Sequence, residues 1–416
     1  MKTYSFPKDF LWGTATSAHQ IEGDNTNSDW WAWEQSKYYP GDRVSINEQK
    51  PVFKEDREYP LEPSGKACDS YNRYKEDFDL AVGLNNNAIR ISVEWARLEP
   101  KQNEFSEKEF AHYRRVLSAA KKRGLKTFVT LHHFTNPIWF AEKGGWTNLR
   151  VSKMFAKYSK KCAEELGDLV DTFITINEPQ VYTLQGYTNG MWPPNKINPI
   201  LSFWVQVNMA KAHKAAYSAI KSVNKNYQVG IVKNIVWYQT YSRRYHFLDK
   251  LAVKFLYFLG NGFFLNMLGK KIDFIGLNYY FSSRVRHLRI DNPNDWVSDL
   301  GWWIYPSGLE RILLYLGKKY PGLPIYITEN GLADSDDKNR IKFLKEMLTS
   351  ISSAIKKGVG VKGYFHWSLL DNYEWHHGFW PRFGLVKVDR EGGLKRKPRK
   401  SYYEYAKICG SNEVLS

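Results

Sequence analysis

The chain alternates short apolar runs with longer segments in which apolar residues recur every three or four positions. Eight of the short runs are rich in β-branched and aromatic residues: Phe10–Ala18, Asn87–Val93, Lys126–His133, Thr172–Pro179, Tyr227–Asn234, Asp273–Tyr280, Pro324–Asn330 and Val361–Leu369. Because nearly every position in them is apolar, the runs are typical of parallel strands buried on both faces. We therefore predict eight such strands.

Amphipathic helices are predicted between these strands, at Tyr71–Leu84, Glu107–Lys122, Val151–Leu166, Leu201–Ser222, Gly308–Lys319 and Ile341–Lys356. The alternation of strand and helix favours a parallel sheet, and eight parallel strands can close into a barrel. No change in composition, internal repeat or Pro/Gly/Ser-rich linker divides the chain. The prediction is an α/β protein with a single (β/α)8 TIM barrel, one domain over residues 1–416.

Composition agrees with a globular protein, since 43% of the 416 residues are hydrophobic and 25% are charged. The three cysteines (Cys68, Cys162 and Cys409) include no CxxC pair and cannot build a disulfide framework. The amino terminus carries Lys8 and Asp9 where a secretory signal would be apolar, so we expect a cytoplasmic protein.

No transmembrane helix is predicted, because the longest charge-free apolar stretch, Phe255–Gly269, is shorter than the roughly 20 residues that cross a bilayer. The net charge of +17 is spread along the chain. Its densest basic run, Lys395–Lys400, leads directly into a helical pattern. We interpret the charge as a solvated basic surface and expect no nucleic-acid partner.

Polar side chains gather where the predicted strands end. They are Ser17, His19 and Gln20, Arg90, His132 and His133, Asn177 and Glu178, Asn278, Tyr279 and Tyr280, Glu329 and Asn330, and His366 and Trp367. The carboxyl ends of barrel strands form the active face of this fold. A buried polar group without a partner costs about 1–3 kcal/mol, so we expect these residues to form a functional site.

Two glutamates stand out in that set. Glu178 lies in the sequence TINEP and Glu329 in ITENG, each at the end of an apolar run and before a Pro or Gly. Strands four and seven of a barrel open into the same cavity, so two acids distant in sequence can flank one bond of a ligand. Paired carboxylates cleave glycosidic bonds. The alternative is a pair of unrelated acids that cap helices or form ion pairs.

Together with FLWGTATSAHQIEG (Phe10–Gly23), NYY (Asn278–Tyr280) and WSLLDNYEW (Trp367–Trp375), these motifs resemble those of family 1 glycoside hydrolases, the β-glucosidases and β-glycosidases. The resemblance covers almost the whole chain in the family's order. It implies a retaining enzyme that removes the non-reducing terminal glucosyl, galactosyl or fucosyl residue from small β-glycosides through a covalent glycosyl-enzyme. Whether water or another acceptor intercepts that intermediate stays open. A non-catalytic carbohydrate-binding barrel would need neither glutamate.

The resemblance also implies a role for individual residues. Glu178 is then the acid/base and Glu329 the nucleophile, with carboxyl groups about 5–5.5 Å apart. Arg90 and Tyr280 are expected beside Glu329, and Asn177 at the 2-hydroxyl of the sugar. The remaining sugar-binding positions are Gln20, His133, Glu374 and Trp375, with the ring of Trp367 beneath the sugar.

Glu374 would repel a 6-phosphate, so a neutral hexose is favoured. No metal or cofactor is expected. The GxGxxG pattern at Gly358, Gly360 and Gly363 precedes a strand instead of following one, and the histidines form no HExxH.

The chain departs from the family in two places. The connection Ile235–Ile272 is shorter than most members carry and is rich in Phe, Leu and Lys. We hypothesise that residues 243–271, with Arg243, Arg244, Lys270 and Lys271, dock on anionic lipid or receive alkyl aglycones. The alternative is a buried barrel helix with snorkelling lysines.

The second departure lies in HHFTNP, where Phe134 replaces the family's usual Trp and Thr135–Asn136 its usual Asp-Leu. The resemblance therefore implies no hydroxyl contact at these three positions. The sequence does not indicate an oligomeric state.

Overall fold

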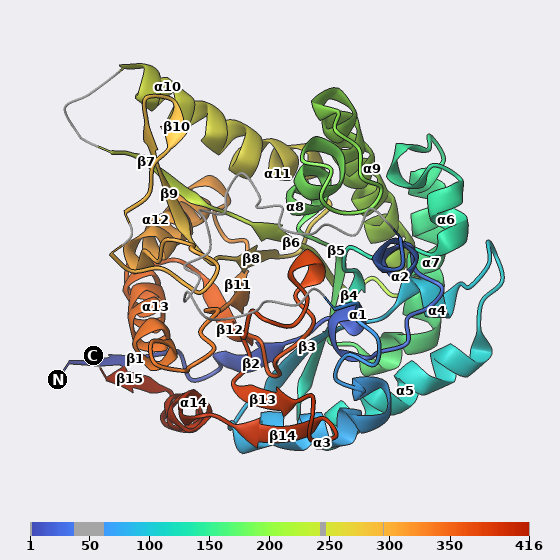
Figure 1. The fold of residues 1–416 in the computed structure, drawn as a ribbon, viewed down its shortest axis with the longest axis horizontal. Coiled ribbons are helices and arrows are strands. Elements are labelled where there is room, and N and C mark those ends of the chain that lie inside the picture. Colours follow the sequence, from blue (N-terminus) through green and yellow to red (C-terminus); the bar gives the residue numbers. More distant parts are fainter. Residues whose placement is uncertain (1, 37–61, 242–246, 294, 416) are drawn as a thin grey trace.

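The computed structural model describes residues 2–36, 62–241, 247–293 and 295–415. Eight parallel strands close into a barrel in the order β2, β3, β4, β5, β6, β8, β11, β12 (Figure 1). Their bounds are β2 (Leu11–Ala15), β3 (Ala88–Ser92), β4 (Lys126–His132), β5 (Thr172–Asn177), β6 (Gln228–Asn234), β8 (Ile275–Asn278), β11 (Ile325–Asn330) and β12 (Val361–Trp367). Each lies within one predicted run. The predicted (β/α)8 TIM barrel is therefore confirmed.

The barrel interior is packed with aromatic rings below the strand ends. Phe128 contacts Phe365 and Tyr326 at ring-centroid distances of 4.7 and 5.1 Å, and Phe274 contacts Tyr326 at 5.4 Å. Gly13 makes room for this layer, because a Cβ there would lie 2.5 Å from the ring of Phe365. This apolar floor leaves only the carboxyl ends of the strands open for chemistry.

The six predicted helices are all present around the barrel. They are α3 (Ser70–Gly83), α5 (Glu107–Lys122), α7 (Val151–Leu166), α9 (Pro199–Val223), α12 (Pro306–Lys319) and α13 (Arg340–Lys356), with α14 (Lys400–Ser411) after them. Helix α9 begins two residues earlier than predicted. The side chain of Asn198 caps it by accepting from the Leu201 amide at 3.0 Å, and Pro199 occupies its first turn.

Short elements occupy the loops. The helices are α1 (Ala18–Ile21), α2 (Asp29–Glu34), α4 (Trp95–Leu98), α6 (Ile138–Glu142), η1 (Gly145–Thr147), η2 (Gly167–Leu169), α8 (Pro179–Thr183), η3 (Leu184–Thr188) and η5 (Trp375–His377). The strands are β1 (Thr3–Ser5), β7 (Trp237–Thr240), β9 (Ser282–Arg286), β10 (Arg289–Ile290), β13 (Val386–Asp389), β14 (Lys395–Pro398) and β15 (Glu413–Leu415). The sequence predicted none of these seven strands outside the barrel. One antiparallel pair joins β1 to β15, so the two ends of the chain lie side by side (Figure 1).

The basic run Lys395–Lys400 takes part in the fold. Arg396 Nε donates to Asp77 Oδ1 at 2.9 Å, and Arg399 Nη2 donates to Asp371 Oδ2 at 2.5 Å. Two of its cations are therefore neutralised by buried carboxylates. This explains a basic cluster without invoking an acidic ligand.

One long helical segment crosses the top of the barrel between β7 and β8 (Figure 1). It comprises α10 (Phe247–Leu256), η4 (Tyr257–Gly262) and α11 (Phe263–Leu268). By length and composition alone it could cross a membrane, although only 29% of its most apolar window is buried. The absence of a transmembrane helix stays a prediction, but the helical segment is longer than the apolar run on which it was based, because the helix continues through Asn261 and Gly262 as a π-helical turn. Arg243 and Arg244 lie outside the described residues.

Candidate active site

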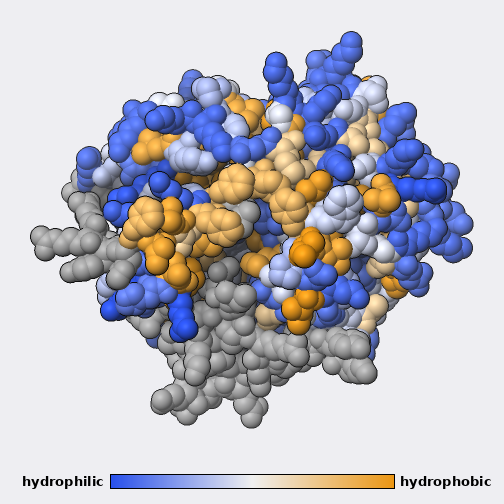
Figure 2. Space-filling model, turned by 90° about the horizontal axis from the view of Figure 1, so that it is seen from above, coloured by the Kyte–Doolittle hydropathy of each residue, from blue (hydrophilic) through white to orange (hydrophobic). Residues whose placement is uncertain are grey.

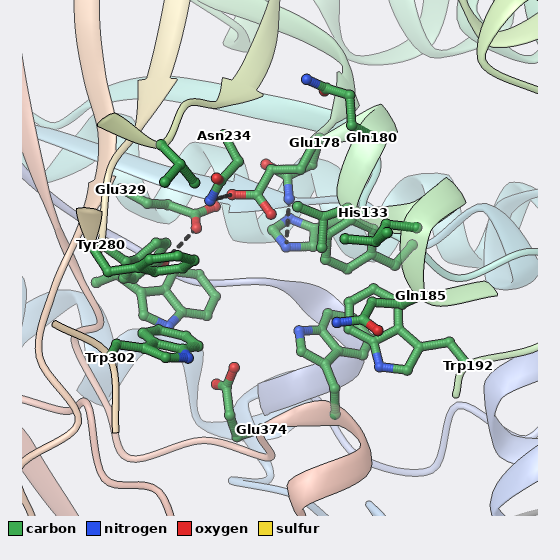
Figure 3. A pocket seen from close by; sticks show the side chains of 18 of the residues that line it. His133, Glu178, Gln180, Gln185, Trp192, Asn234, Tyr280, Trp302, Glu329 and Glu374 are labelled. Atoms are coloured by element: carbon green, nitrogen blue, oxygen red, sulfur yellow. Dashed lines mark hydrogen bonds between the residues drawn. The ribbon is translucent and has the colours of Figure 1, made fainter. Parts of the chain in front are cut away.

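A pocket opens at the carboxyl ends of the barrel strands (Figure 3). Eight of the ten predicted site residues line it: His133, Asn177, Glu178, Tyr280, Glu329, Trp367, Glu374 and Trp375. The other two, Arg90 and Gln20, are fully buried behind its wall. Segments from one end of the chain to the other thus converge on one cavity.

Glu329 is held by two donors. Arg90 Nη1 forms a buried ion pair with Glu329 Oε1, and the Tyr280 hydroxyl donates to Glu329 Oε2 at 2.6 Å. Arg90 Nη2 also donates to Asn177 Oδ1 at 2.7 Å. Each carboxylate oxygen of Glu329 therefore has its own partner, and the side chain is fixed in one orientation facing the cavity.

Glu178 differs from Glu329 in its surroundings. Burial raises its pKa, and the negative charge of Glu329 adds to the rise, to about 8. Two amides oppose the shift by donating to Glu178 Oε1, Asn278 Nδ2 at 2.6 Å and Asn234 Nδ2 at 3.2 Å. At neutral pH, Glu178 accordingly retains its proton next to an ion-paired carboxylate. Such a division between two neighbouring acids is what general acid catalysis beside a nucleophile requires.

The backbone at Glu178 is in the left-handed region, with φ of 42°. Successive residues of a regular strand point to opposite faces. The turn after β5 breaks that alternation, so that Asn177 and Glu178 both line the pocket. Phe134 and Trp375, which also line it, have φ of 72° and 50°. Each such residue costs on the order of 1–3 kcal/mol, so the surrounding structure must enforce these conformations.

His133 lines the pocket with a neutral ring. Burial lowers its pKa well below the usual value, with the charge of Arg90 contributing, so the ring is neutral. Asn177 Nδ2 lies 3.2 Å from Nε2, and when the amide donates there, the ring proton resides on Nδ1. In the part of the chain that the structure describes, Nδ1 has no hydrogen-bond partner.

Gln20 does not reach the cavity directly. Its oxygen accepts from Ser17 at 2.6 Å, while its nitrogen donates to the Tyr373 carbonyl at 2.7 Å and lies 3.4 Å from Glu374 Oε2. The amide thus supports Glu374, which does line the pocket.

Aromatic rings that the sequence did not single out form the side walls. Figure 3 shows Trp302 on one side of the cavity and Trp192 on the other. Phe134, at the position where the family usually has Trp, also lines the pocket. The next two residues do not: Thr135 donates to Glu94 at 2.8 Å and Asn136 to Asp29 at 2.7 Å. The sequence indicated these aromatic walls only through its 16% aromatic content.

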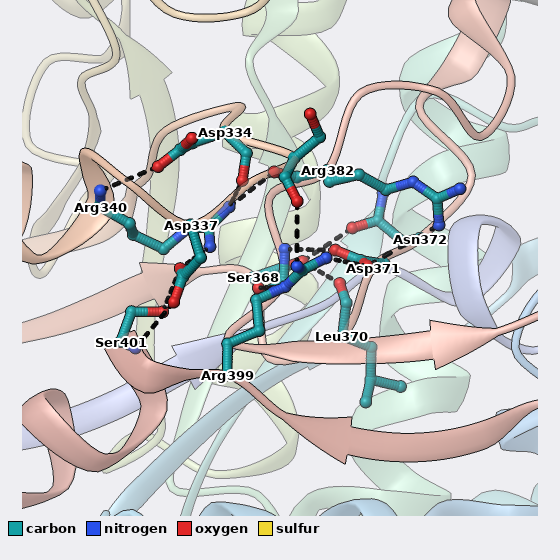
Figure 4. Close-up of polar contacts among 12 residues, drawn as sticks. Asp334, Asp337, Arg340, Ser368, Leu370, Asp371, Asn372, Arg382, Arg399 and Ser401 are labelled. Carbon is teal, nitrogen blue, oxygen red and sulfur yellow. Dashed lines mark hydrogen bonds and ion pairs between the residues drawn. The ribbon is translucent and has the colours of Figure 1, made fainter.

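A polar network ties the loops after β11 and β12 to the C-terminal segment (Figure 4). Arg399 donates to Asp371 at 2.5 Å and to the Ser335 carbonyl at 3.1 Å. Arg340 is fully buried, pairs with Asp337 and donates to the Arg382 carbonyl at 2.8 Å. These contacts fix the two strands that carry Glu329 and Trp367.

Within the described ranges, no group of three or more His, Cys, Asp and Glu side chains is arranged to hold a metal ion.

The chain matches the family description "Glycosyl hydrolase family 1" over residues 2–270 and 264–414. It is 32% identical to β-glucosidase A of Thermotoga maritima, with 99% of each chain covered. The structure is similar to that of a β-glycosidase from Pyrococcus horikoshii, with a TM-score of 0.88, 38% identity and coverage of 100% and 97% of the two chains. A galactolipid galactosyltransferase of Arabidopsis thaliana is 33% identical, over 82% of this chain and 57% of its own.

Proposed function

The chain belongs to glycosyl hydrolase family 1, and on that premise we propose a role for each residue of the site and a class of aglycone. The protein is a retaining β-glycosidase of the β-glucosidase type, acting on small sugar substrates. It hydrolyses the non-reducing terminal β-D-glycosyl residue, glucose or also galactose or fucose, by double displacement through a covalent glycosyl-enzyme.

In our proposal, Glu329 is the nucleophile and Glu178 the general acid of the first step. The Glu329 carboxylate attacks the anomeric carbon while Glu178 transfers its proton to the glycosidic oxygen, which leaves with the aglycone. The observation that carries this assignment is the asymmetry of the pair. Glu329 is ion-paired with Arg90, whereas the pKa of Glu178 is raised to about 8.

The second step uses Glu178 as a base. Once Glu329 is esterified, the charge that helped to raise the pKa of Glu178 is gone, so that pKa falls. Asn278 and Asn234, which donate to Glu178 Oε1, stabilise the carboxylate that results. Glu178 then takes a proton from water as the water attacks the anomeric carbon, and Glu329 leaves.

The neighbouring residues position the reactants. Arg90 and Tyr280 orient Glu329, and Asn177, itself held by Arg90, contacts the 2-hydroxyl, where a hydrogen bond strengthens in the oxocarbenium-like transition state. His133, which lines the pocket, contacts a second hydroxyl.

Glu374 accepts from two further hydroxyls, supported by Gln20, while Trp367 and Trp375 supply the flat surfaces. The charge of Glu374 disfavours a phosphorylated sugar.

Replacing the proposed acid tests the scheme. With Glu178→Ala, the hydrolysis of substrates with poor leaving groups should be lost, because no group protonates the glycosidic oxygen. An activated aryl β-glucoside should still glycosylate Glu329, and azide should then restore turnover and give a β-glycosyl azide, identified by NMR. An α-configured azide would contradict double displacement.

For the aglycone, we propose amphiphilic β-glycosides with an alkyl chain, taken up by a cytoplasmic enzyme that docks peripherally on anionic membrane. Five apolar side chains of α10 and η4 are between 42% and 74% exposed: Phe247, Leu248, Leu251, Phe255 and Phe258. The exposure disfavours the alternative of a buried barrel helix. Lys250 and Lys254 on the same helix can contact lipid phosphates.

A second group of exposed side chains lies on and before the start of α9, at Ile197, Ile200, Phe203 and Trp204. The two groups are bridged by Phe263, whose ring centroid lies 4.9 Å from that of Phe203 and 5.9 Å from that of Phe258. Figure 2, which faces this side of the molecule, shows apolar side chains gathered across it among hydrophilic ones. The galactolipid named for the Arabidopsis relative supports a lipid-linked sugar as substrate. The three free, buried cysteines agree with a reducing compartment.

Vesicle co-sedimentation tests the docking part. The protein should bind phosphatidylglycerol vesicles at low salt and lose binding at high salt, because exposed charges are screened. The double substitution Phe255→Ser/Phe258→Ser should weaken binding by about tenfold or more, through loss of buried apolar area. Leu149→Ser, at a still more exposed apolar position outside this surface, is the control. Absence of wild-type binding at low salt would remove the membrane proposal and leave the hydrolase assignment intact.

A further inference from the structure

The exposed helical segment is fastened to the barrel by polar contacts beside the acid. Gln180 Nε2 donates to the Gly260 carbonyl at 2.6 Å, and Lys233 Nζ donates to the same carbonyl. One residue further on, Asn261 Nδ2 donates to the Val236 carbonyl at 2.9 Å. The π-helical turn η4 therefore has three side-chain hydrogen bonds to the β5 and β6 region.

Lys233 is an unusual residue for this place. It lies within barrel strand β6 and is fully buried. Its hydrogen-bond acceptors in the described part of the chain are two carbonyl oxygens, that of Gly260 and that of Asn234 at 3.1 Å. Burial lowers its pKa well below the usual value, against the opposing charge of Glu178. Lysine is almost never fully buried without a specific partner, so the Gly260 contact needs a reason.

Three consecutive residues of β6 contact either Glu178 or Gly260. The Val232 carbonyl accepts from the Glu178 amide at 2.9 Å, and Asn234 donates to the Glu178 side chain. Lys233 stands between them and holds Gly260. The distance between η4 and Glu178 is therefore set over a single short stretch of β6.

The segment that Lys233 holds is also part of the pocket. Gly260 and Asn261 line it together with Val181, Val236 and Tyr238, on the side of Glu178 that the leaving group must occupy. The opposite side of the same helix exposes Phe255 and Phe258. Any displacement of η4 would alter the wall along which an aglycone leaves the pocket toward the exposed surface.

We propose that Lys233, assisted by Gln180, is a positioning residue that holds the Gly260–Asn261 wall at a fixed place relative to Glu178 and thereby sets the preference of the enzyme for long apolar aglycones. The inference rests on the proposed function. It attributes the aglycone preference to the buried contact between Lys233 and Gly260, which lies outside the set of sugar-binding residues.

The test compares two substrates with the same sugar. For Lys233→Met, the ratio of kcat/KM for octyl β-D-glucoside to that for methyl β-D-glucoside should fall at least about tenfold, a difference on the scale of one misplaced methylene contact. The loss should appear mainly in KM for the octyl substrate. Lys362→Met, which removes an exposed lysine from barrel strand β12, is the matched control and should leave the ratio unchanged.

Gln180→Met removes the other side chain that donates to the Gly260 carbonyl. It should lower the octyl-to-methyl ratio on its own, and the double variant should lower it by more than the product of the two single effects, because the Gly260 carbonyl then loses both donors. If Lys233→Met does not fold, Gln180→Met alone decides. An unchanged ratio, or equal losses on both substrates, would overturn the inference. Failure of the wild-type protein to hydrolyse either glucoside would instead overturn the proposed function.

Discussion

The two walls of the pocket are built in different ways. The wall that faces the sugar comes from the ends of barrel strands, and its polar groups, Arg90, Asn177 and Glu329, are almost completely buried and bonded to one another. The wall that faces the leaving group comes from η3 and from η4, whose helix has an exposed apolar outer face.

This difference separates chemistry from selectivity. A buried network admits few alternative arrangements, because every change leaves a polar group without a partner. A helix that crosses the barrel and is held by a few hydrogen bonds can change its side chains or its position without disturbing that network. We therefore expect substitutions in the first wall to affect all substrates and those in the second to affect substrates according to their aglycone.

The largest effect should come from the nucleophile. Glu329→Gln keeps the shape of the side chain but removes the carboxylate that attacks the sugar, so kcat/KM should fall at least about 10³-fold for every aglycone alike. Steady-state rates on methyl, octyl and aryl β-glucosides would measure this. A decrease below tenfold would contradict the nucleophile assignment and the contrast between the walls.

A smaller effect, on stability, should come from the network beneath the first wall. Asp371→Asn leaves Arg399 without its carboxylate partner in a site where both side chains are nearly buried, and should cost about 3 kcal/mol of unfolding free energy. Thermal denaturation would show a decrease in Tm of several degrees. Asp168→Asn, which breaks an exposed pair with Arg114, should barely change Tm. Equal shifts for the two variants would contradict the importance of the buried network.

The smallest effect should be a shift in pH dependence. Asn278 stabilises the ionised form of Glu178, so Asn278→Ala should raise the pKa of Glu178 and move the basic limb of kcat/KM upward from about pH 8. The shift should be about one unit, given about 1–2 kcal/mol for a hydrogen bond to a charged group.

Asn234→Ala should shift the limb less, because its contact is longer, 3.2 against 2.6 Å. A downward shift in either variant would contradict the assignment of Glu178 as the acid.

Much of the first wall could be predicted from the sequence. Strands buried on both faces give continuous apolar runs, so a polar residue at the end of such a run, such as Glu178 or Glu329, is conspicuous. The support that these residues receive was harder to predict. Lys233 looks like the polar end of a strand, and the positive φ of Phe134 depends on contacts distant in sequence.

Most of the second wall, which faces the leaving group, could not be predicted from the sequence. Strands β7 and β9 are partly polar and, among the described residues, form a small sheet with β10 apart from the barrel, so they lack the pattern of a buried strand. The turn at η4 contains Gly260, Asn261 and Gly262, residues that usually end a helix. Packing and hydrogen bonds from the barrel keep this segment helical, and they are not visible in local sequence.

The antiparallel contact between Thr3–Ser5 and Glu413–Leu415 has a practical consequence for engineering. A short peptide could join the two ends of the polypeptide and new ends could be opened in a surface loop, giving a circular permutant with the same catalytic barrel. Such a rearranged enzyme could carry a fused module at any chosen loop of its surface.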